Sequence, residues 1–256
     1  MAPRGLKKAL KDTAPCKLVG SGIYKHFEIK PTGTKRGIKL KGLTKRLQSH
    51  IFSDGDLPMI AKHSAAPAGG HWRGPDGGRK RGSAVDAQVS RLAGVSADKR
   101  YASKMLNLTR MVFSALCTRG LEPIMGQRAV CSQLHRVGTA ADIVCHDAEN
   151  RAVVIVELKC GHSGARTAAA LKSGNVCNMN APLSKAYDST LHRHLAQLAV
   201  THHLLTRETE TVKKLSNMGI ESVDGILMYA NDSGVDVYTL DPWWIAKAPK
   251  ILQKLR

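Results

Sequence analysis

Apolar residues follow a helical spacing in two parts of the chain. Between Ser83 and Gly120 they recur at steps of three and four positions, at Val85, Val89, Leu92, Met105, Leu108, Val112 and Leu116. The same spacing returns over residues 182–207, at Leu191, Leu195, Leu198, His202 and Leu205. Side chains three and four residues apart share one face of a helix. The pattern therefore predicts two helices before residue 120 and one long helix over residues 182–207.

Shorter apolar runs, rich in β-branched residues, predict strands instead. One extended segment covers residues 121–132. Two further pairs of runs are each joined by four polar, turn-forming residues, "DAEN" and "NDSG", and so predict antiparallel hairpins. These pairs are 141–146 with 151–159, and 225–230 with 235–240. A last helix is expected over residues 243–255, and together the elements predict an α/β (α+β) fold, a central mixed β-sheet flanked by helices.

The first third of the chain has little sustained periodicity. Residues 62–82 are so rich in Gly, Pro and Arg that they predict a linker or flexible loop. We therefore expect a basic, largely irregular N-terminal extension and linker over residues 1–80, followed by a folded domain over residues 81–256.

Charge changes this picture by indicating a partner. The chain carries a formal net charge of +19, and residues 1–82 hold 18 Lys and Arg against five Asp and Glu. Such an excess repels itself unless a polyanion or counterions lie nearby, and nucleic acid is the obvious candidate. The basic N-terminal third is expected either to contact DNA phosphates or to act as a localisation signal.

Composition also bears on the compartment. Six cysteines without a C-x-x-C pair and without a secretory signal favour free thiols in a reducing, intracellular compartment that contains DNA, such as the nucleus. A basic start that is nearly free of acids keeps mitochondrial targeting as the alternative. No apolar run approaches the roughly 18 residues needed to cross a bilayer, so no membrane partner is expected.

The first hairpin brings charged residues together. If residues 147–150 form the turn, Asp142 lies opposite Glu157, with Cβ atoms roughly 4.5–5.5 Å apart, and Lys159 shares their face. The alternative is that these are ordinary solvent-facing strand residues. The nearly continuous apolar run around them, Val153–Val156 and Leu158, favours burial, although a single bulge would move Asp142 to the opposite face.

Two adjacent carboxylates repel one another unless a cation lies between them, and oxygen ligands favour Mg²⁺ or Mn²⁺. Such an ion polarises a phosphodiester and lowers the pKa of a bound water. Lys159 is expected to position or help to deprotonate that water and to offset transition-state charge. The sequence therefore predicts a catalytic centre of Asp142, Glu157 and Lys159.

The triplet Glu157-Leu158-Lys159 resembles the closing motif of the PD-(D/E)XK nuclease superfamily. Asp86 in "RGSAVDAQV" and Gln197 in "HLAQLAVTHH" match the helix motifs of its RecB-like and lambda-exonuclease-like (YqaJ-type) branches. Three positions depart from the family pattern: Ala141 replaces proline, Thr201 replaces tyrosine, and Asp86 replaces the more frequent glutamate or histidine.

This resemblance implies a restriction-endonuclease-like core and a set of site residues. The metal would be held by Asp142, Glu157 and the Leu158 carbonyl, with Asp86 completing the shell. DNA would be bound by Arg81, Ser83, Arg193, His194 and Gln197.

The predicted function is a Mg²⁺-dependent deoxyribonuclease, more specifically an exonuclease that acts on duplex DNA with an end in recombination, repair or genome processing. Two alternatives stay open. One is a non-catalytic basic protein that binds or packages DNA, and the other is a dimeric resolvase of branched DNA. Cleavage polarity, DNA over RNA and the oligomeric state are left open.

Overall fold

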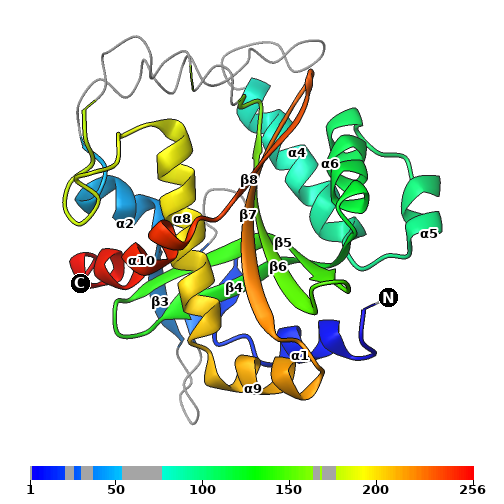
Figure 1. Ribbon diagram of the computed structural model, residues 1–256, viewed down its shortest axis with the longest axis horizontal. Helices are drawn as coiled ribbons and strands as arrows, with labels where there is room; N and C mark the ends of the chain where they lie inside the picture. Colours follow the sequence, from blue (N-terminus) through cyan, green and yellow to red (C-terminus); the bar gives the residue numbers. More distant parts are fainter. Residues whose placement is uncertain (1, 21–25, 30–36, 54–76, 164–167, 169–176) are drawn as a thin grey trace.

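The computed structural model describes residues 2–20, 26–29, 37–53, 77–163, 168 and 177–256, drawn as ribbon in Figure 1. Eight strands form one mixed sheet flanked by helices, so the expected α+β class is confirmed. The strands are β1 (Lys17–Val19), β2 (His26–Ile29), β3 (Ile38–Gly42), β4 (Leu121–Ser132), β5 (Val137–Asp147), β6 (Ala152–Cys160), β7 (Ser222–Asn231) and β8 (Gly234–Thr239).

The sheet runs in the order β1-β2-β3-β5-β6-β7-β8, with β4 paired to β5 off this path. The β3–β5 and β6–β7 pairs are parallel, and the others are antiparallel. Strand β5 pairs with β4 along one edge, and along its other edge it pairs first with β3 and then with β6. β3 pairs with Val137 and Gly138, and β6 pairs from Ile143 onward. On that edge, residues 139–142 pair with no strand of the described part of the chain.

Helices cover both faces of the sheet (Figure 1). The larger core packs α1 (Leu6–Asp12), α2 (Leu43–His50), α8 (Thr190–Thr206), α9 (Thr209–Asn217) and α10 (Pro242–Lys254) against one face. A second core packs α4 (Gly77–Leu92) and α6 (Asn107–Thr118) against the other, and α5 (Ala97–Ala102) lies between these two helices in the chain. Among the described helices, none is long and apolar enough to span a membrane.

The expectation of a largely irregular N-terminal extension is wrong for its described part. Strands β1 to β3 continue the sheet, and Leu6, Leu10, Leu43 and Leu47 are fully buried in the larger core. The apolar residues of this region are few, but they are placed to pack onto a sheet supplied by the rest of the chain. Their stability is therefore tertiary and leaves little local periodicity in the sequence.

The predicted linker over residues 62–82 also needs correction. Residues 62–76 lie outside the described part, whereas residues 77–82 form the first turns of α4. Gly77 and Arg81 are buried on this helix, four positions apart like Val85 and Val89. The buried face of α4 thus begins at Gly77, about two turns before its first large apolar residue, Val85. The expected domain boundary at residue 81 falls inside α4.

Two other helical predictions differ in their limits. Residues 77–120 hold three helices, α4, α5 and α6, in place of the two expected between Ser83 and Gly120. The long helix begins at Thr190 and not near Pro182, because the Ser189 side chain accepts a 3.2 Å hydrogen bond from His192 N and caps the first turn. Strand β4, both hairpins and the C-terminal helix, capped by Asp241, are confirmed.

Candidate active site

The β5–β6 hairpin has the predicted register. Five pairs, from Asp147↔Ala152 to Ile143↔Val156, follow the pattern that places Asp142 next to Glu157. The ladder stops one position before that pair. At that position the Asp142 side chain replaces the backbone pairing, because its Oδ2 accepts a 2.8 Å hydrogen bond from Leu158 N. The two carboxylates therefore meet where the strands β5 and β6 separate.

The Leu158 backbone also faces this opening. In a strand, the N–H and C=O of one residue point to the same side. Because Leu158 N donates toward Asp142 on β5, the Leu158 carbonyl points to the β5 side as well. Two of the three predicted ligands, the Asp142 carboxylate and the Leu158 carbonyl, thus lie on the β5 side of β6.

Glu157 is 1% exposed and sits at the centre of a polar group. Its Oε1 accepts a bond from Lys159 Nζ and a 2.7 Å bond from Gln197 Nε2 on α8. Gln197 Oε1 in turn accepts a 3.3 Å bond from Thr44 on α2. The predicted glutamine therefore contacts the Glu157 carboxylate directly, and Thr44 on α2 contacts the glutamine in turn.

Helix α4 brings a third carboxylate to the same place through a bridge. Gln127 Nε2 donates to Asp86 Oδ1 at 2.7 Å and to Asp142 Oδ1 at 3.4 Å. Gln127 has φ of +53° and follows Gly126. Gly126 lies so close to Ser90 on α4 that a Cβ atom on residue 126 would be 2.5 Å from the Ser90 Cα atom. This close approach between β4 and α4 places the amide between the two acids.

Asp86, Asp142 and Lys159 line one pocket of about 430 Å³, and Glu157 lies buried behind its wall. Its walls come from the start of α4, including Ser83 and Asp86, and from the end of β6, including Lys159 and His162, with Asp142 between them. Of the residues predicted to bind DNA, Ser83 lines this pocket. The pocket is open to solvent, and its volume is within the usual range of ligand-binding sites.

Burial dominates the ionisation of the acids. It raises the pKa of Asp142 to about 8, and the nearby Glu157 adds to this shift. Burial raises the pKa of Glu157 too, although Lys159 opposes the shift. Burial alone would lower the pKa of Lys159, but Glu157 and Asp142 outweigh it, so that pKa is raised. The site therefore holds a stable ammonium beside carboxyl groups that need a further cation to ionise fully.

His194 faces the sheet next to this centre. Its Nδ1 lies 2.9 Å from the Tyr229 hydroxyl, and its ring is 5.1 Å from that of His162. Burial, with Lys159 and His162 adding to it, lowers the pKa of His194 well below its usual value. His194 is therefore neutral, and the DNA contact predicted for it stays a prediction.

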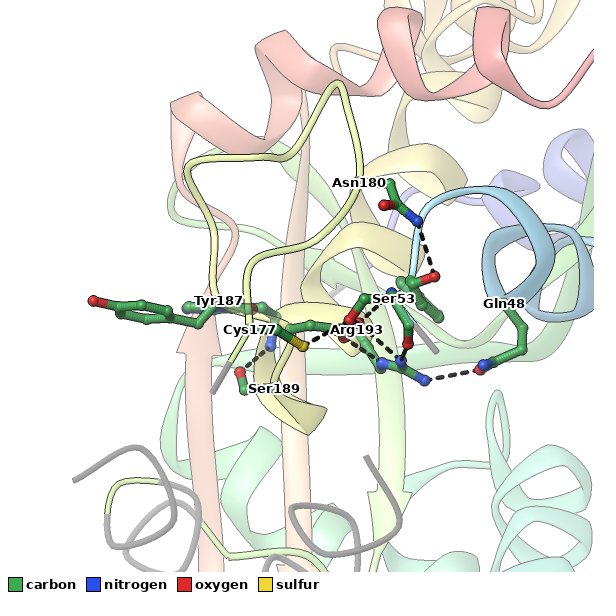
Figure 2. Close-up of polar contacts among 10 residues, drawn as sticks. Gln48, Ser53, Cys177, Asn180, Tyr187, Ser189 and Arg193 are labelled. Atoms are coloured by element: carbon green, nitrogen blue, oxygen red, sulfur yellow. Dashed lines mark hydrogen bonds and ion pairs between the residues drawn. The ribbon is translucent and has the colours of Figure 1, made fainter. Parts of the chain in front are cut away.

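Arg193 holds the start of α8 to the end of α2 (Figure 2). Its Nε donates to the buried Asp188 at 2.5 Å, its other nitrogens reach Gln48 at 2.8 Å and the Ser53 carbonyl at 3.2 Å, and its guanidinium stacks 4.2 Å above the Phe52 ring. Asp188 also accepts from Ser53 N and Oγ. A DNA contact by Arg193, which stays a prediction, would compete with these bonds.

Arg81 is 5% exposed and bonds to the Asp232 carboxylate at 2.9 and 3.1 Å. Its Nε and second terminal nitrogen are buried without a partner in the described structure. Arg81 therefore joins α4 to the β7–β8 turn, and its predicted DNA contact is untested.

Sequence reasoning missed three contributors to the site: Gln127, Thr44 and Tyr229. Gln127 carried no signal except the glycine before it. Thr44 lies in the region that was expected to be irregular. Tyr229 lies in an apolar strand of the predicted second hairpin, and it packs in the core while its hydroxyl reaches His194.

Among the described residues, no group of three or more His, Cys, Asp or Glu side chains is close enough to form a preformed metal cage. The carboxylate pair and the Leu158 carbonyl are nevertheless hard oxygen donors of the kind that bind Mg²⁺. Comparison of the sequence with protein-family models and with curated proteins finds no match.

Proposed function

We propose that this chain is a Mg²⁺-dependent deoxyribonuclease with its catalytic centre at Asp142, Glu157 and Lys159. One observation carries the proposal: where β5 and β6 separate, Asp142 and Lys159 line one pocket, and the buried Glu157 bonds to Lys159 directly behind it. Charged groups are costly to bury, and a pocket that gathers them with shifted pKa values is typical of a functional site.

The residues present fit a divalent ion. Glu157 Oε2 is buried and has no hydrogen-bond partner in the described structure. Asp142 is held largely protonated at neutral pH by burial and by Glu157, a state that a cation would reverse. Asp142, Glu157 and the Leu158 carbonyl would hold the ion, with Asp86 nearby. When bound, Mg²⁺ or Mn²⁺ supplies a Lewis acid that polarises a phosphodiester and lowers the pKa of water.

Lys159 was expected to position or help to deprotonate the attacking water and to offset transition-state charge, and the raised pKa argues against the deprotonation alone. A lysine that stays protonated cannot accept a proton from the attacking water. Its ammonium can, however, stabilise negative charge that develops on the phosphate oxygens. Gln197 orients Glu157 by donating to Oε1, and Gln127 holds Asp142 and Asp86 together.

The order of these residues supports the finer part of the proposal, a restriction-endonuclease-like core. Asp86 lies on α4, Asp142 on β5, the Glu157-Leu158-Lys159 triplet on β6 and Gln197 on α8. This is the order of the PD-(D/E)XK motifs that the sequence resembles. The proposed substrate is duplex DNA with an end, and the proposed reaction is hydrolysis of its phosphodiester bonds.

A second candidate, a non-catalytic protein that binds DNA, is favoured by one contact. Lys159 already neutralises Glu157 by direct bonding, so the centre is partly compensated without a metal. A net charge of +19 would supply the affinity for DNA.

The experiment that separates these candidates uses linear and covalently closed circular duplex DNA, each with Mg²⁺ or with EDTA. Cleavage of the linear DNA only, and only with Mg²⁺, is the expected result for an exonuclease. Cleavage of the circle as well would indicate an endonuclease. Binding of both DNAs without any cleavage would contradict the proposed activity and favour the second candidate.

The pKa of Asp142 predicts how stability depends on pH. An unfolded aspartate titrates near pH 4, whereas the folded Asp142 titrates near pH 8. Between these values the folded state binds more protons than the unfolded state, so the free energy of unfolding falls as pH rises. In EDTA, Asp142→Asn should flatten this fall between pH 4 and pH 8 by more than about 1.4 kcal/mol, the equivalent of one pKa unit.

The measurement is urea unfolding at several pH values, followed by circular dichroism. Asp224→Asn is the matched control, because Asp224 is exposed on β7. If Asp142→Asn and Asp224→Asn gave the same pH profile as the wild type, the raised pKa of Asp142 would be refuted.

A further inference from the structure

A second pocket, of about 280 Å³, lies at the other end of the β5 edge. It is lined by Lys39, Lys41, Arg46, Leu134, His135, Arg136 and Arg256, and we call it the β3–α2 basic pocket. The lining holds five Lys and Arg side chains and no carboxylate side chain. Lys39 and Lys41 lie on β3, Arg46 lies on α2, Arg136 lies in the turn between β4 and β5, and Arg256 lies two residues after the end of α10. The fold thus brings these cations together from distant parts of the sequence.

The cations of this pocket lack compensation. Glu28 lies opposite Lys39 on β2, but among the described residues no ion pair involves Lys41, Arg46 or Arg136. Arg46 Nε is moreover buried without a hydrogen-bond partner in the described structure. A buried donor without an acceptor is costly, and an anion in the pocket would satisfy it.

Two histidines close to these cations have lowered pKa values, which is consistent with a positive potential at the pocket. The pKa of His50 is lowered by burial and then by Arg46, Lys254 and Lys41. The pKa of His135 is lowered by burial and then by Arg256. Each histidine is therefore disfavoured in its charged form by cations that stand close to it.

The β3–α2 basic pocket is linked to the catalytic centre by two elements. Strand β5 runs from Arg136 at the pocket to Asp142, and six residues of strand span roughly 20 Å. Helix α2 turns Arg46 to the pocket and Thr44, two residues earlier, to Gln197. Phosphates of a DNA duplex lie at separations of this size, along one strand or across a groove, so one duplex reaches both sites.

We infer that the β3–α2 basic pocket binds the phosphodiester backbone of the duplex whose other part enters the catalytic pocket. The inference rests on the proposed function for the identity of the ligand. It adds a site that anchors the DNA roughly 20 Å from the bond to be cleaved. Such an anchor contributes affinity and register without reading the base sequence.

The test measures DNA binding in EDTA, where cleavage plays no part. A 30-base-pair duplex carrying a fluorophore is titrated with wild type and with a triple variant, Lys41→Gln, Arg46→Gln and Arg136→Gln. Each lost phosphate contact should cost roughly eightfold in affinity at 0.1 M salt. We expect the triple variant to bind at least about 30-fold more weakly and to lower the slope of log K against log salt by about 2 to 3.

The matched control removes the same charge elsewhere. Lys99, Lys213 and Lys214 are exposed on α5 and α9, and their triple change to Gln should weaken binding less than about threefold. A charge-preserving variant, Lys41→Arg, Arg46→Lys and Arg136→Lys, should bind like the wild type, and thermal unfolding confirms that each protein is folded. Equal binding by the pocket variant and the control would overturn the inference.

Two further results separate the possible ligands. If the pocket variant lost binding to poly-glutamate but kept binding to the duplex, the pocket would serve an acidic protein and the inference would fail. If the wild type bound DNA through this pocket but cleaved none, the inference would hold and the nuclease proposal would not.

Discussion

Replacing Glu157 with alanine is expected to abolish Mg²⁺-dependent cleavage, lowering the single-turnover rate by at least about a thousandfold. Among the described residues of the proposed catalytic centre, Glu157 has the only buried carboxylate oxygen that lacks a partner, Oε2, and its Oε1 accepts bonds from Lys159 and Gln197. The neutral isostere Glu157→Gln should lose as much, because charge and not volume binds the cation. Lys159→Ala should also abolish cleavage, since it removes the ammonium that offsets transition-state charge.

The matched control for this prediction is Glu149→Gln. Glu149 is an exposed carboxylate in the turn of the same hairpin, so its loss removes one negative charge without touching the pocket. Rates are measured on end-labelled duplex with excess enzyme, and duplex binding in EDTA shows that each variant is folded and competent. Retained cleavage by purified Glu157→Ala or Lys159→Ala would rule out this centre as the catalytic one.

The largest expected effect on stability comes from Arg128, on the far side of β4 from the pocket. Arg128 is 1% exposed and donates to Glu208 Oε2 at 2.5 Å, to Thr211 Oγ1 at 3.2 Å and to the Ala129 carbonyl. Removing one partner of a buried ion pair leaves the other charge buried and unpaired, which lowers the free energy of unfolding by about 3–5 kcal/mol. Arg128→Ala should therefore lower the free energy of unfolding by that amount at neutral pH.

The pH dependence of this loss provides an internal check. Burial already raises the pKa of Glu208, although Arg128 opposes the shift. Without Arg128 that pKa rises further, so the folded state holds a proton on Glu208 and the destabilisation grows as pH increases. Urea unfolding at pH 5 and pH 8 should show the smaller loss at pH 5.

Two variants control for the Arg128 result. Glu221→Gln removes an exposed ion pair with Arg151 and should cost less than about 1 kcal/mol. The double variant Arg128→Met with Glu208→Leu removes both charges and should be markedly more stable than Arg128→Ala. If Arg128→Ala cost no more than Glu221→Gln, the buried pair would not stabilise the fold.

The parts of the site that the sequence predicts are those set by local rules. A turn at residues 147–150 between two apolar runs fixes the register of β5 against β6, and that register brings Asp142 to Glu157. Helical spacing likewise places Gln197 on a face of α8, four positions after Arg193. These relations need only the pattern within one or two neighbouring elements.

The remaining parts depend on contacts between distant segments. Strand β3 joins β5 in parallel at only two pairs, Lys41↔Val137 and Gly42↔Gly138, which no local pattern in a Gly- and Lys-rich region signals. Gln127 reaches Asp86 and Asp142 because β4 approaches α4 closely at Gly126. Arg193, expected to bind DNA, meets Asp188 and Phe52 because the chain before α8 folds against the end of α2.

The central claim is that Asp142 and Glu157 together hold a divalent cation, and the most direct test is to count bound Mn²⁺ by electron paramagnetic resonance. The wild type and Glu149→Gln should bind Mn²⁺ with the same affinity. Asp142→Asn and Glu157→Gln should each lose about tenfold or more. Equal Mn²⁺ binding by all four proteins would contradict a metal site at these two carboxylates.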